Sequence, residues 1–283
     1  MSSFFDDLEA AVNESPFDEI PVSVEQFVQS KDYLGLPPLS DLQYAMVKHM
    51  SQILRLETLI EAYGEREGKR RYAETSKEVI LVLGKGSGKD YCTVIALCYV
   101  VYQLLCLKNP QEYYGKPDGD AIDLLNIAQN ADQARNVFFK GFVTRIKRCP
   151  WFAGKFTPKN REVEFDKSIT AFSGHSDAEA YEGLNLLFCV LDEISGFQTS
   201  SNTGNANAVT AKSTYEYYSD AVLSRFADNG VLAMLSFPRS KRDFILEKYE
   251  DVIAEKETIP FSHKFKIRND LPDGIENNEF TIH

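Results

Sequence analysis

A glycine-rich stretch between two apolar segments constrains the fold of this chain more than any other feature. Residues 79–83 are β-branched or aliphatic, and residues 84–90 read Gly-Lys-Gly-Ser-Gly-Lys-Asp before a long apolar segment with helical spacing. A strand, a glycine loop, a lysine and a helix form the layout of a phosphate-binding loop. Glycines let successive backbone N–H groups converge on one anion, and the helix N-terminus adds a partial positive charge. The stretch therefore predicts a nucleotide site in which Lys89 reaches the β- and γ-phosphates.

Two residues depart from the usual pattern, which is Gly-x-x-x-x-Gly-Lys followed by Ser or Thr. Leu83 stands where the first glycine belongs, and Asp90 stands where a magnesium-binding hydroxyl is expected. A glycine-rich turn between a strand and a helix can also be purely structural, so the loop alone leaves that alternative open.

The rest of the chain alternates predicted strands with predicted helices. This alternation predicts an α/β fold with a mostly parallel sheet, helices on both of its faces, and the ligand site at its carboxyl edge. Strands are expected at residues 78–83, 122–128, 163–165, 169–172, 186–191, 231–235 and 264–267, and helices at 42–63, 89–107, 131–149, a segment ending near 226, and 242–255.

Two adjacent acidic residues follow the most apolar of these strands. Residues 186–191 form a continuous apolar run, typical of a central strand buried on both faces, and Asp192 and Glu193 come directly after it. Buried carboxylates are costly without partners, and Mg²⁺ supplies one. In a phosphate-loop ATPase the aspartate holds the Mg²⁺ shell, and the glutamate orients and deprotonates the attacking water. The alternative is a polar strand end that leads into a turn.

Two further polar residues are candidates for the same site. Gln43 lies in the first turn of a helix that Ser40 and Asp41 can cap, and a glutamine can pair with N6 and N7 of adenine. Ser236 follows the strand at 231–235 and precedes Phe-Pro, where a hydroxyl can sense the γ-phosphate and transmit its loss. The alternatives are a solvent-facing glutamine and an ordinary turn.

Charge and cysteine content exclude several classes of protein. The net charge is −11, and residues 1–30 hold seven acids and no Lys or Arg, so a protein that only coats nucleic acid is excluded. Five cysteines without a C-x-x-C pair predict reduced thiols and no disulfide framework or zinc site.

Residues 91–107 are too short and too mixed for a membrane span, and the N-terminus lacks a signal peptide, so we expect a soluble, cytoplasmic protein without a membrane partner. Residues 1–30 are expected to be loosely held or to form short helices, and residues 64–75 to form an exposed charged loop.

Taken together, these motifs resemble the ATPase domain of the large terminase subunit of tailed bacteriophages, the motor that packages DNA into a procapsid. The resemblance is carried by the glutamine before the glycine loop, by Ala-Tyr-Glu-Gly-Leu-Asn at 180–185 leading into the acidic strand, and by Ser-Phe-Pro at 236–238. It covers roughly residues 35–245. It implies a P-loop NTPase fold of the ASCE type, with ATP and Mg²⁺ as cofactors.

The same resemblance implies ATP hydrolysis that drives double-stranded DNA into a viral procapsid, in the cytoplasm of the host. The implied partners are double-stranded DNA, the portal protein and the small terminase subunit. A homo-oligomeric ring, a pentamer, is the assembled state that the family suggests, and a monomer is expected in isolation.

Carried over residue by residue, the resemblance implies specific roles. Glu193, Lys89 and Lys85 would be catalytic, and Lys85 stands where many terminases carry an arginine. Asp192 and Asp90 would be the metal ligands. The implied nucleotide-binding residues are Gln43, Gly84, Lys85, Gly86, Ser87, Gly88, Lys89 and Asp90.

Other positions either match the family without a catalytic role or depart from it. Ser236 falls in the coupling motif, and Glu182 stands where some terminases place an arginine that acts on a neighbour's nucleotide. A glutamate cannot take that role. Candidates for the missing cation are, in descending order, Arg225, Arg239 and Arg135. The positions that resemble the family's helix start after the second strand are Asn130, Gln133 and Ala134.

Large terminases also carry a C-terminal nuclease domain, and about 40 residues after the last ATPase helix start are too few for one. We therefore expect an acidic N-terminal segment at 1–35, a P-loop ATPase domain at 36–268, and a linker or chain end at 269–283 without the nuclease. Two other functions remain open. A helicase-like or remodelling ATPase would unwind duplex DNA without a portal partner. A degenerate loop serving as an interaction module would not bind nucleotide.

Overall fold

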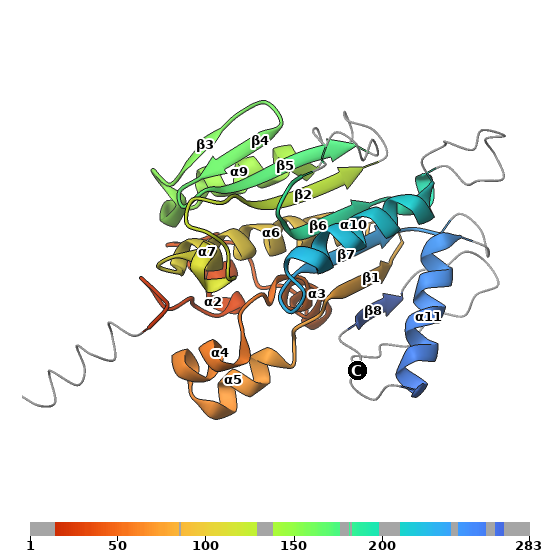
Figure 1. Cartoon of the computed structure of the whole chain (residues 1–283), viewed down its shortest axis with the longest axis horizontal. Helices are drawn as coiled ribbons and strands as arrows, with labels where there is room; N and C mark the ends of the chain where they lie inside the picture. The colour runs from red at the N-terminus through yellow and green to blue at the C-terminus, as the bar shows by residue number, and fades with distance from the viewer. Residues whose placement is uncertain are drawn as a thin grey trace, which may run out of the picture.

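The computed structural model describes residues 15–84, 86–128, 138–175, 181, 183–197, 210–238, 243–258 and 264–268. These residues form one eight-stranded sheet with helices on both faces (Figure 1). The strands are β1 Glu78–Val82, β2 Ile122–Ala128, β3 Phe156–Pro158, β4 Glu162–Phe165, β5 Ile169–His175, β6 Leu186–Asp192, β7 Val231–Ser236 and β8 Lys264–Arg268. The helices are α2 Val24–Gln29, α3 Asp41–Ser51, α4 Leu56–Tyr63, α5 Glu65–Tyr72, α6 Lys89–Cys106, α7 Pro110–Tyr113, α9 Lys140–Arg148, α10 Ala211–Arg225 and α11 Phe244–Thr258, with 3-10 turns η2 Pro150–Phe152 and η4 Ile194–Gly196.

The sheet has the strand order β3-β4-β5-β2-β6-β7-β1-β8. β3, β4 and β5 pair antiparallel, and every other neighbouring pair is parallel. One strand, β7, lies between the strand before the glycine loop and the strand before the acidic pair, which is the ASCE arrangement of a P-loop NTPase. The predicted fold class is therefore confirmed, and the short edge strand β3 is the one strand that the sequence did not predict among the described residues.

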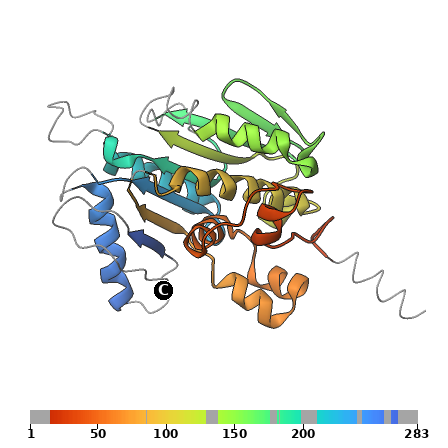
Figure 2. The same cartoon turned by 180° about the vertical axis from the view of Figure 1, so that it is seen from behind.

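Two hydrophobic cores lie on opposite faces of the sheet. One contains α2, α3, α6 and α9, and the other contains α10 and α11. Figure 2 shows α6 and α9 covering the face that is turned away from the viewer in Figure 1. The side chains of β1, β2, β6 and β7 alternate between the two cores, so these strands are buried along their whole length and mostly apolar.

α6 begins at the glycine loop and is the central helix of the first core. By length and composition it could cross a membrane, but 89% of its most apolar window is buried inside the fold. This is the position of a core helix. All five cysteines are free and buried, as the sequence predicts.

Two local predictions are wrong. The helix expected at 42–63 is broken between α3 and α4, because the side chain of Gln52 accepts the N–H of Leu54 and Tyr113 accepts the N–H of Arg55. The loop expected at 64–75 contains the helix α5. Its mixed charges form ion pairs at helical spacing, and Gly68 packs so closely on α4 that an added Cβ would lie 2.6 Å from the Cα of Ile60.

The acidic segment at the start of the chain was expected to be loosely held or to form short helices. In residues 15–30 the structure shows the second alternative, with the short helix α2. Phe17, Phe27 and Val28 are buried, and the backbone of Asp18 hydrogen-bonds the end of α6. Tyr33 and Phe27 also contact Tyr102 of α6, so this segment forms part of the first core. Apolar residues in an acidic sequence were too sparse to predict this packing.

Candidate nucleotide site

The carboxyl ends of β1, β6 and β7 form the edge where the predicted site residues meet. The parallel register pairs Val82 with Ser236 and Asp192 with Leu235, so the three strands end at the same level. Because parallel strands direct their following loops to one edge, the glycine loop and the acidic pair lie next to each other although about 100 residues separate them in sequence. In Figure 1 the arrowheads of these strands mark that edge.

The glycine loop joins β1 to α6 through residues with left-handed backbone. Gly86 and Gly88 have φ of 81° and 84°, and Gly88 is the N-cap of α6. L-residues rarely adopt this conformation, so glycine is required here. The N–H of Ser87 donates to the carbonyl of Gly84 at 3.4 Å, and the Ser87 hydroxyl is buried without a hydrogen-bond partner. Lys85 lies outside the described residues.

The lysine of the loop contacts the second acidic residue directly. Lys89 is 7% exposed, and its Nζ lies 2.6 Å from Oε1 of Glu193 and 3.7 Å from Oδ1 of Asp90. Burial alone would lower the pKa of Lys89. The hydrogen bond to Glu193 and the carboxylates of Asp90 and Asp192 outweigh burial, so the pKa is raised above its usual value. The ammonium is therefore held in its charged form among three carboxylates.

The first acidic residue is in the least favourable electrostatic position. Asp192 is 4% exposed, and its Oδ1 has no hydrogen-bond partner among the described residues. Burial, followed by the neighbouring charges of Asp90 and Glu193 and opposed by Lys89, raises its pKa from 3.8 to about 7. Oδ1 of Asp90 is also buried without a hydrogen bond from a described residue, and its one cation among these residues is Lys89 at 3.7 Å. Two neighbouring carboxylates whose inner oxygens accept no hydrogen bond repel each other unless a proton or a cation lies between them.

This pair is a donor set that fits Mg²⁺. Among the described residues, no three Cys, His, Asp or Glu side chains converge on a metal position. Mg²⁺ does not need them, because it commonly takes one or two carboxylates and completes its shell with water and substrate phosphates. Asp192 and Asp90 would provide the protein ligands, and their unpartnered oxygens are the observation that supports the fit.

Glu193 has an unusual backbone. Its φ is 53°, in the left-handed region, and its carbonyl accepts the N–H of Gly196 at 2.7 Å. A non-glycine residue in this region is strained, and such strain is often found at functional sites. The turn directs the Glu193 side chain toward Lys89 directly after β6 ends.

Gln43 reaches the same site from α3. Its Oε1 accepts the N–H of Ser40 and its N–H donates to the Ser40 hydroxyl, which is a capping box. The capping box fixes the side chain so that its Nε2 lies 3.0 Å from where a Cβ on Gly88 would be. The structure thus places Gln43 against the last glycine of the loop.

Ser236 connects the loop to the acidic turn. It is fully buried, its carbonyl accepts the N–H of Leu83 at 3.1 Å, and its Oγ accepts the N–H of Ser195 at 3.1 Å. Leu83 precedes the glycine loop and Ser195 follows Glu193. Ser236 therefore hydrogen-bonds both the segment before the glycine loop and the turn after Glu193.

The sequence did not single out one residue of this edge, Asn126 on β2. Asn126 is 1% exposed, and neither its amide nitrogen nor its amide oxygen has a hydrogen-bond partner in the described part of the chain. It pairs with Val190 in the register, and Asp192 lies two residues further along β6 on the same face. Buried amides are almost always hydrogen-bonded, so an unpaired one calls for an explanation. A polar residue in the middle of a mostly apolar strand was the only sequence signal.

Several predicted positions lie away from this edge or outside the described residues. Arg225 donates to the side chain of Asn185 and to the carbonyl of Gly183, which precede β6 and therefore lie at the opposite edge of the sheet. The predicted positions outside the described residues are Lys85, Asn130, Gln133, Ala134, Arg135, Glu182 and Arg239.

Strand order, glycine loop and acidic pair together define a P-loop NTPase domain. Comparison with known families agrees, since the family described as the N-terminal P-loop domain of the uncharacterized protein MJ0330 matches residues 2–270. The chain belongs to this family. MJ0330 of Methanocaldococcus jannaschii is 30% identical over 201 residues, which cover 65% of this chain and 34% of that protein.

Solved structures show the same fold. The HK97 bacteriophage large terminase superimposes with a TM-score of 0.56 at 15% identity, covering 89% of this chain and 44% of that one. The ATPase domain of the Thermus phage P74-26 large terminase gives a TM-score of 0.42 at 18% identity, covering 61% of this chain and 64% of that one, too low to add to the argument. The chain thus spans about a third of MJ0330 and less than half of the HK97 protein.

Proposed function

We propose that this domain binds ATP with Mg²⁺ and hydrolyses it. The observation that carries the proposal is the 2.6 Å contact between Lys89 and Glu193, with Asp192 and Asp90 beside it. A loop lysine and the acids of a distant strand meet at the edge where P-loop NTPases bind phosphate. A cluster of this kind is costly to fold unless it serves a ligand.

Each residue has a role that follows from its position. Lys89 binds the β- and γ-phosphates, and Gln43 contacts the nucleotide from α3. Asp192 and Asp90 hold Mg²⁺, which neutralises phosphate charge when bound. When phosphate oxygens bind the ammonium of Lys89, the carboxylate of Glu193 loses its ion-pair partner. It is then free to orient a water and accept its proton.

Ser236 couples this chemistry to the rest of the domain. Its two hydrogen bonds tie the segment before the glycine loop to the turn after Glu193. Loss of the γ-phosphate changes the contacts of Lys89 and Glu193, and the change reaches β7 through Ser236. This is a local event at a ligand that biases a connected element.

We further propose that the hydrolysis drives translocation of double-stranded DNA, with DNA packaging into a procapsid as the biological setting. Its support is the sequence resemblance together with a fold shared with a bacteriophage large terminase. The portal protein, the small terminase subunit and a pentameric ring are the partners and the assembly that this proposal entails. A host cytoplasm is the location that goes with it.

One observation favours a second candidate, a non-catalytic interaction module. The carboxylate of Asp90 lies where a hydroxyl is usual, and it adds negative charge beside Asp192. Negative charge at a phosphate site opposes nucleotide binding. In this candidate the loop keeps its shape without binding ATP.

Calorimetry and phosphate release separate the two candidates. The chain is titrated with ATP in the presence of Mg²⁺, alongside Lys89→Ala, Glu193→Gln and the control Glu216→Gln on an exposed face of α10. We expect Lys89→Ala to weaken binding about 10- to 100-fold, the value of a lost charge-assisted hydrogen bond. Glu193→Gln should bind ATP but lose about 10²- to 10⁴-fold in turnover. The absence of heat with ATP at millimolar concentration would favour the interaction module, and undiminished turnover in Glu193→Gln would remove that residue from catalysis.

A further inference from the structure

Positive charge is concentrated in one segment of an otherwise acidic chain. Residues 138–161 contain no Asp or Glu, although the whole chain has a net charge of −11. Such segregation indicates a local surface that meets a negatively charged partner. The cations of this segment are Lys140, Arg145, Lys147, Arg148, Lys155, Lys159 and Arg161.

Three of these cations form an exposed row on α9. Lys140, Lys147 and Arg148 are exposed, while Phe142 and Ile146 on the other side of the helix are buried. Eight residues of helix separate the ends of the row, which makes it about 12 Å long. No described residue forms an ion pair with any of the three. In Figure 2 α9 lies on the outer surface of the layer that covers the sheet.

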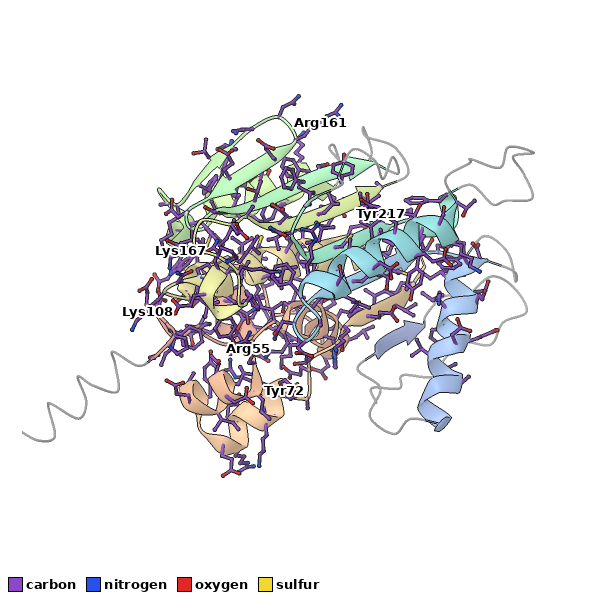
Figure 3. The ribbon with its side chains drawn as sticks, viewed as in Figure 1. Arg55, Tyr72, Lys108, Arg161, Lys167 and Tyr217 are labelled. Atoms are coloured by element: carbon purple, nitrogen blue, oxygen red, sulfur yellow. The ribbon has the colours of Figure 1, made fainter. Side chains whose placement is uncertain are left out.

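In the neighbouring hairpin of β3 and β4, one cation of this segment forms ion pairs with nearby acidic residues. Lys159 pairs there with Glu162 and Glu164. Arg161 at the same turn is exposed without an ion pair among the described residues, and its side chain extends away from the body of the molecule (Figure 3). The cations of α9 and Arg161 therefore remain available at the same end of the sheet.

A structural role for these charges explains only part of the pattern. Lys147 and Arg148 lie in the last turn of α9, where cations are favoured by the helix dipole. Lys140 is at the other end of the helix and Arg161 is on a hairpin, so the dipole does not account for them. The amphipathic character of α9 explains the buried face but not the absence of acidic partners.

The surroundings of the row define the class of partner. Among the described residues, the one large hydrophobic side chain that is exposed is Ile20, which is not on α9 and is single rather than part of an apolar patch. Protein interfaces and amphipathic membrane helices need apolar anchors, and single-stranded nucleic acids need exposed aromatic rings for stacking. A duplex backbone needs neither, because phosphates are bound by Lys and Arg alone.

We propose that α9, flanked by Arg161, binds the phosphate backbone of double-stranded DNA. Lys140, Lys147 and Arg148 would each neutralise one phosphate and carry no base specificity. The inference rests on the proposed function only for the translocation of the duplex after it has bound. Binding at α9 requires no ATP and no residue of the nucleotide site.

Fluorescence anisotropy with a labelled DNA duplex tests the surface. The α9 variant is Lys140→Gln/Lys147→Gln/Arg148→Gln. The matched control, Lys31→Gln/Arg66→Gln/Lys69→Gln, removes the same charge from exposed positions elsewhere on the described surface. Three phosphate contacts give a slope of about −2.7 in log K against log salt, so binding of the parent chain through them weakens about 40-fold over a fourfold rise in salt. We expect the α9 variant to lose this part of the slope and the control to keep it.

Other measurements make the outcomes distinct. Equal losses in the two triple variants, or an unchanged slope in the α9 variant, would overturn the proposal, since net charge alone would then explain binding. Competition by polyglutamate as strong as by unlabelled duplex would overturn the choice of DNA. The α9 variant should melt at the same temperature as the parent chain, because its three side chains are exposed. Lys89→Ala should bind DNA like the parent chain, so failure of the ATPase proposal and failure of this one are separable.

Discussion

Replacing Asp192 by Asn should stabilise the domain, and the gain should depend on pH. Asp192 is 4% exposed, and burial together with Asp90 and Glu193 raises its pKa to about 7 from 3.8. The folded state therefore binds this proton more tightly than the unfolded state does. As pH rises from about 4 through about 7, the folded chain must give up the proton at a cost that the unfolded chain does not bear. The carboxylate thus lowers the free energy of unfolding above pH 7 and has little effect near pH 4.

The size of the effect follows from the shift in pKa. One pKa unit corresponds to about 1.4 kcal/mol, so a difference of about three units amounts to about 4 kcal/mol at high pH. Asn has nearly the same shape and no charge, so Asp192→Asn removes this cost. Because Asp123 and other titrating groups are present in both proteins, their contributions cancel in the difference between the two unfolding free energies.

Urea unfolding of both proteins at a series of pH values measures the difference. We expect it to be small near pH 4 and to approach about 4 kcal/mol in favour of Asp192→Asn at pH 8. Mg²⁺ should stabilise the parent chain at pH 8 and leave Asp192→Asn unchanged, since the ion offers the carboxylate its missing partner. A difference that stays constant with pH, or an Asp192→Asn protein less stable than the parent at pH 8, would refute the reasoning.

Two further substitutions test the neighbouring features. Asn126→Leu should raise the free energy of unfolding by about 1–3 kcal/mol because it removes two unpaired buried polar atoms, and it should lower ATP turnover if the amide orders water beside Asp192. Urea unfolding measures the change in stability, and phosphate release measures the change in turnover. An Asn126→Leu protein that is less stable than the parent chain would contradict the expected gain in stability. Gly88→Ala should cost about 1–2 kcal/mol because φ is 84°. The destabilisation by Gly88→Ala should persist in a Gln43→Ala background, because the strain is in the backbone and the added Cβ meets only the end of the Gln43 side chain. Thermal unfolding measures this. If Gly88→Ala caused no destabilisation in the Gln43→Ala background, the contact with Gln43 and not the backbone conformation would be the cause.

Sequence patterns predicted the fold and the central cluster because both depend on short-range signals. Local composition predicts the end of a strand at three places: before the glycine loop, before Asp192 and before Ser236. Parallel strands direct such ends to one edge, so the meeting of Lys89 with Glu193 follows from topology. Gln43 was a candidate from its place at a helix start, the resemblance to terminases favoured a role for it, and the structure places it against Gly88.

The features that the sequence did not predict depend on contacts between distant segments. α5 has a strongly polar composition and forms because Gly68 lets it pack on α4 while its charges pair along the helix. Residues 17–33 are held on α6 by a few aromatic side chains, among them Phe27 and Tyr33. Asn126 is a polar residue in an apolar strand, and only its neighbours in the sheet show that it borders the site.

Asp90 changes what the site requires before phosphate can enter. With Asp192 ionised, three carboxylates surround the single ammonium of Lys89, so the described cluster carries a net charge of −2 where a hydroxyl at position 90 would leave −1. A free triphosphate meets repulsion at such an edge, whereas a divalent cation is attracted to it. The pKa of about 7 for Asp192 means that a cation would also displace a proton there, which couples its binding to pH. We infer that metal and nucleotide enter this site together, and that the carboxylate of Asp90 makes the loop more dependent on the cation than a loop with the usual hydroxyl.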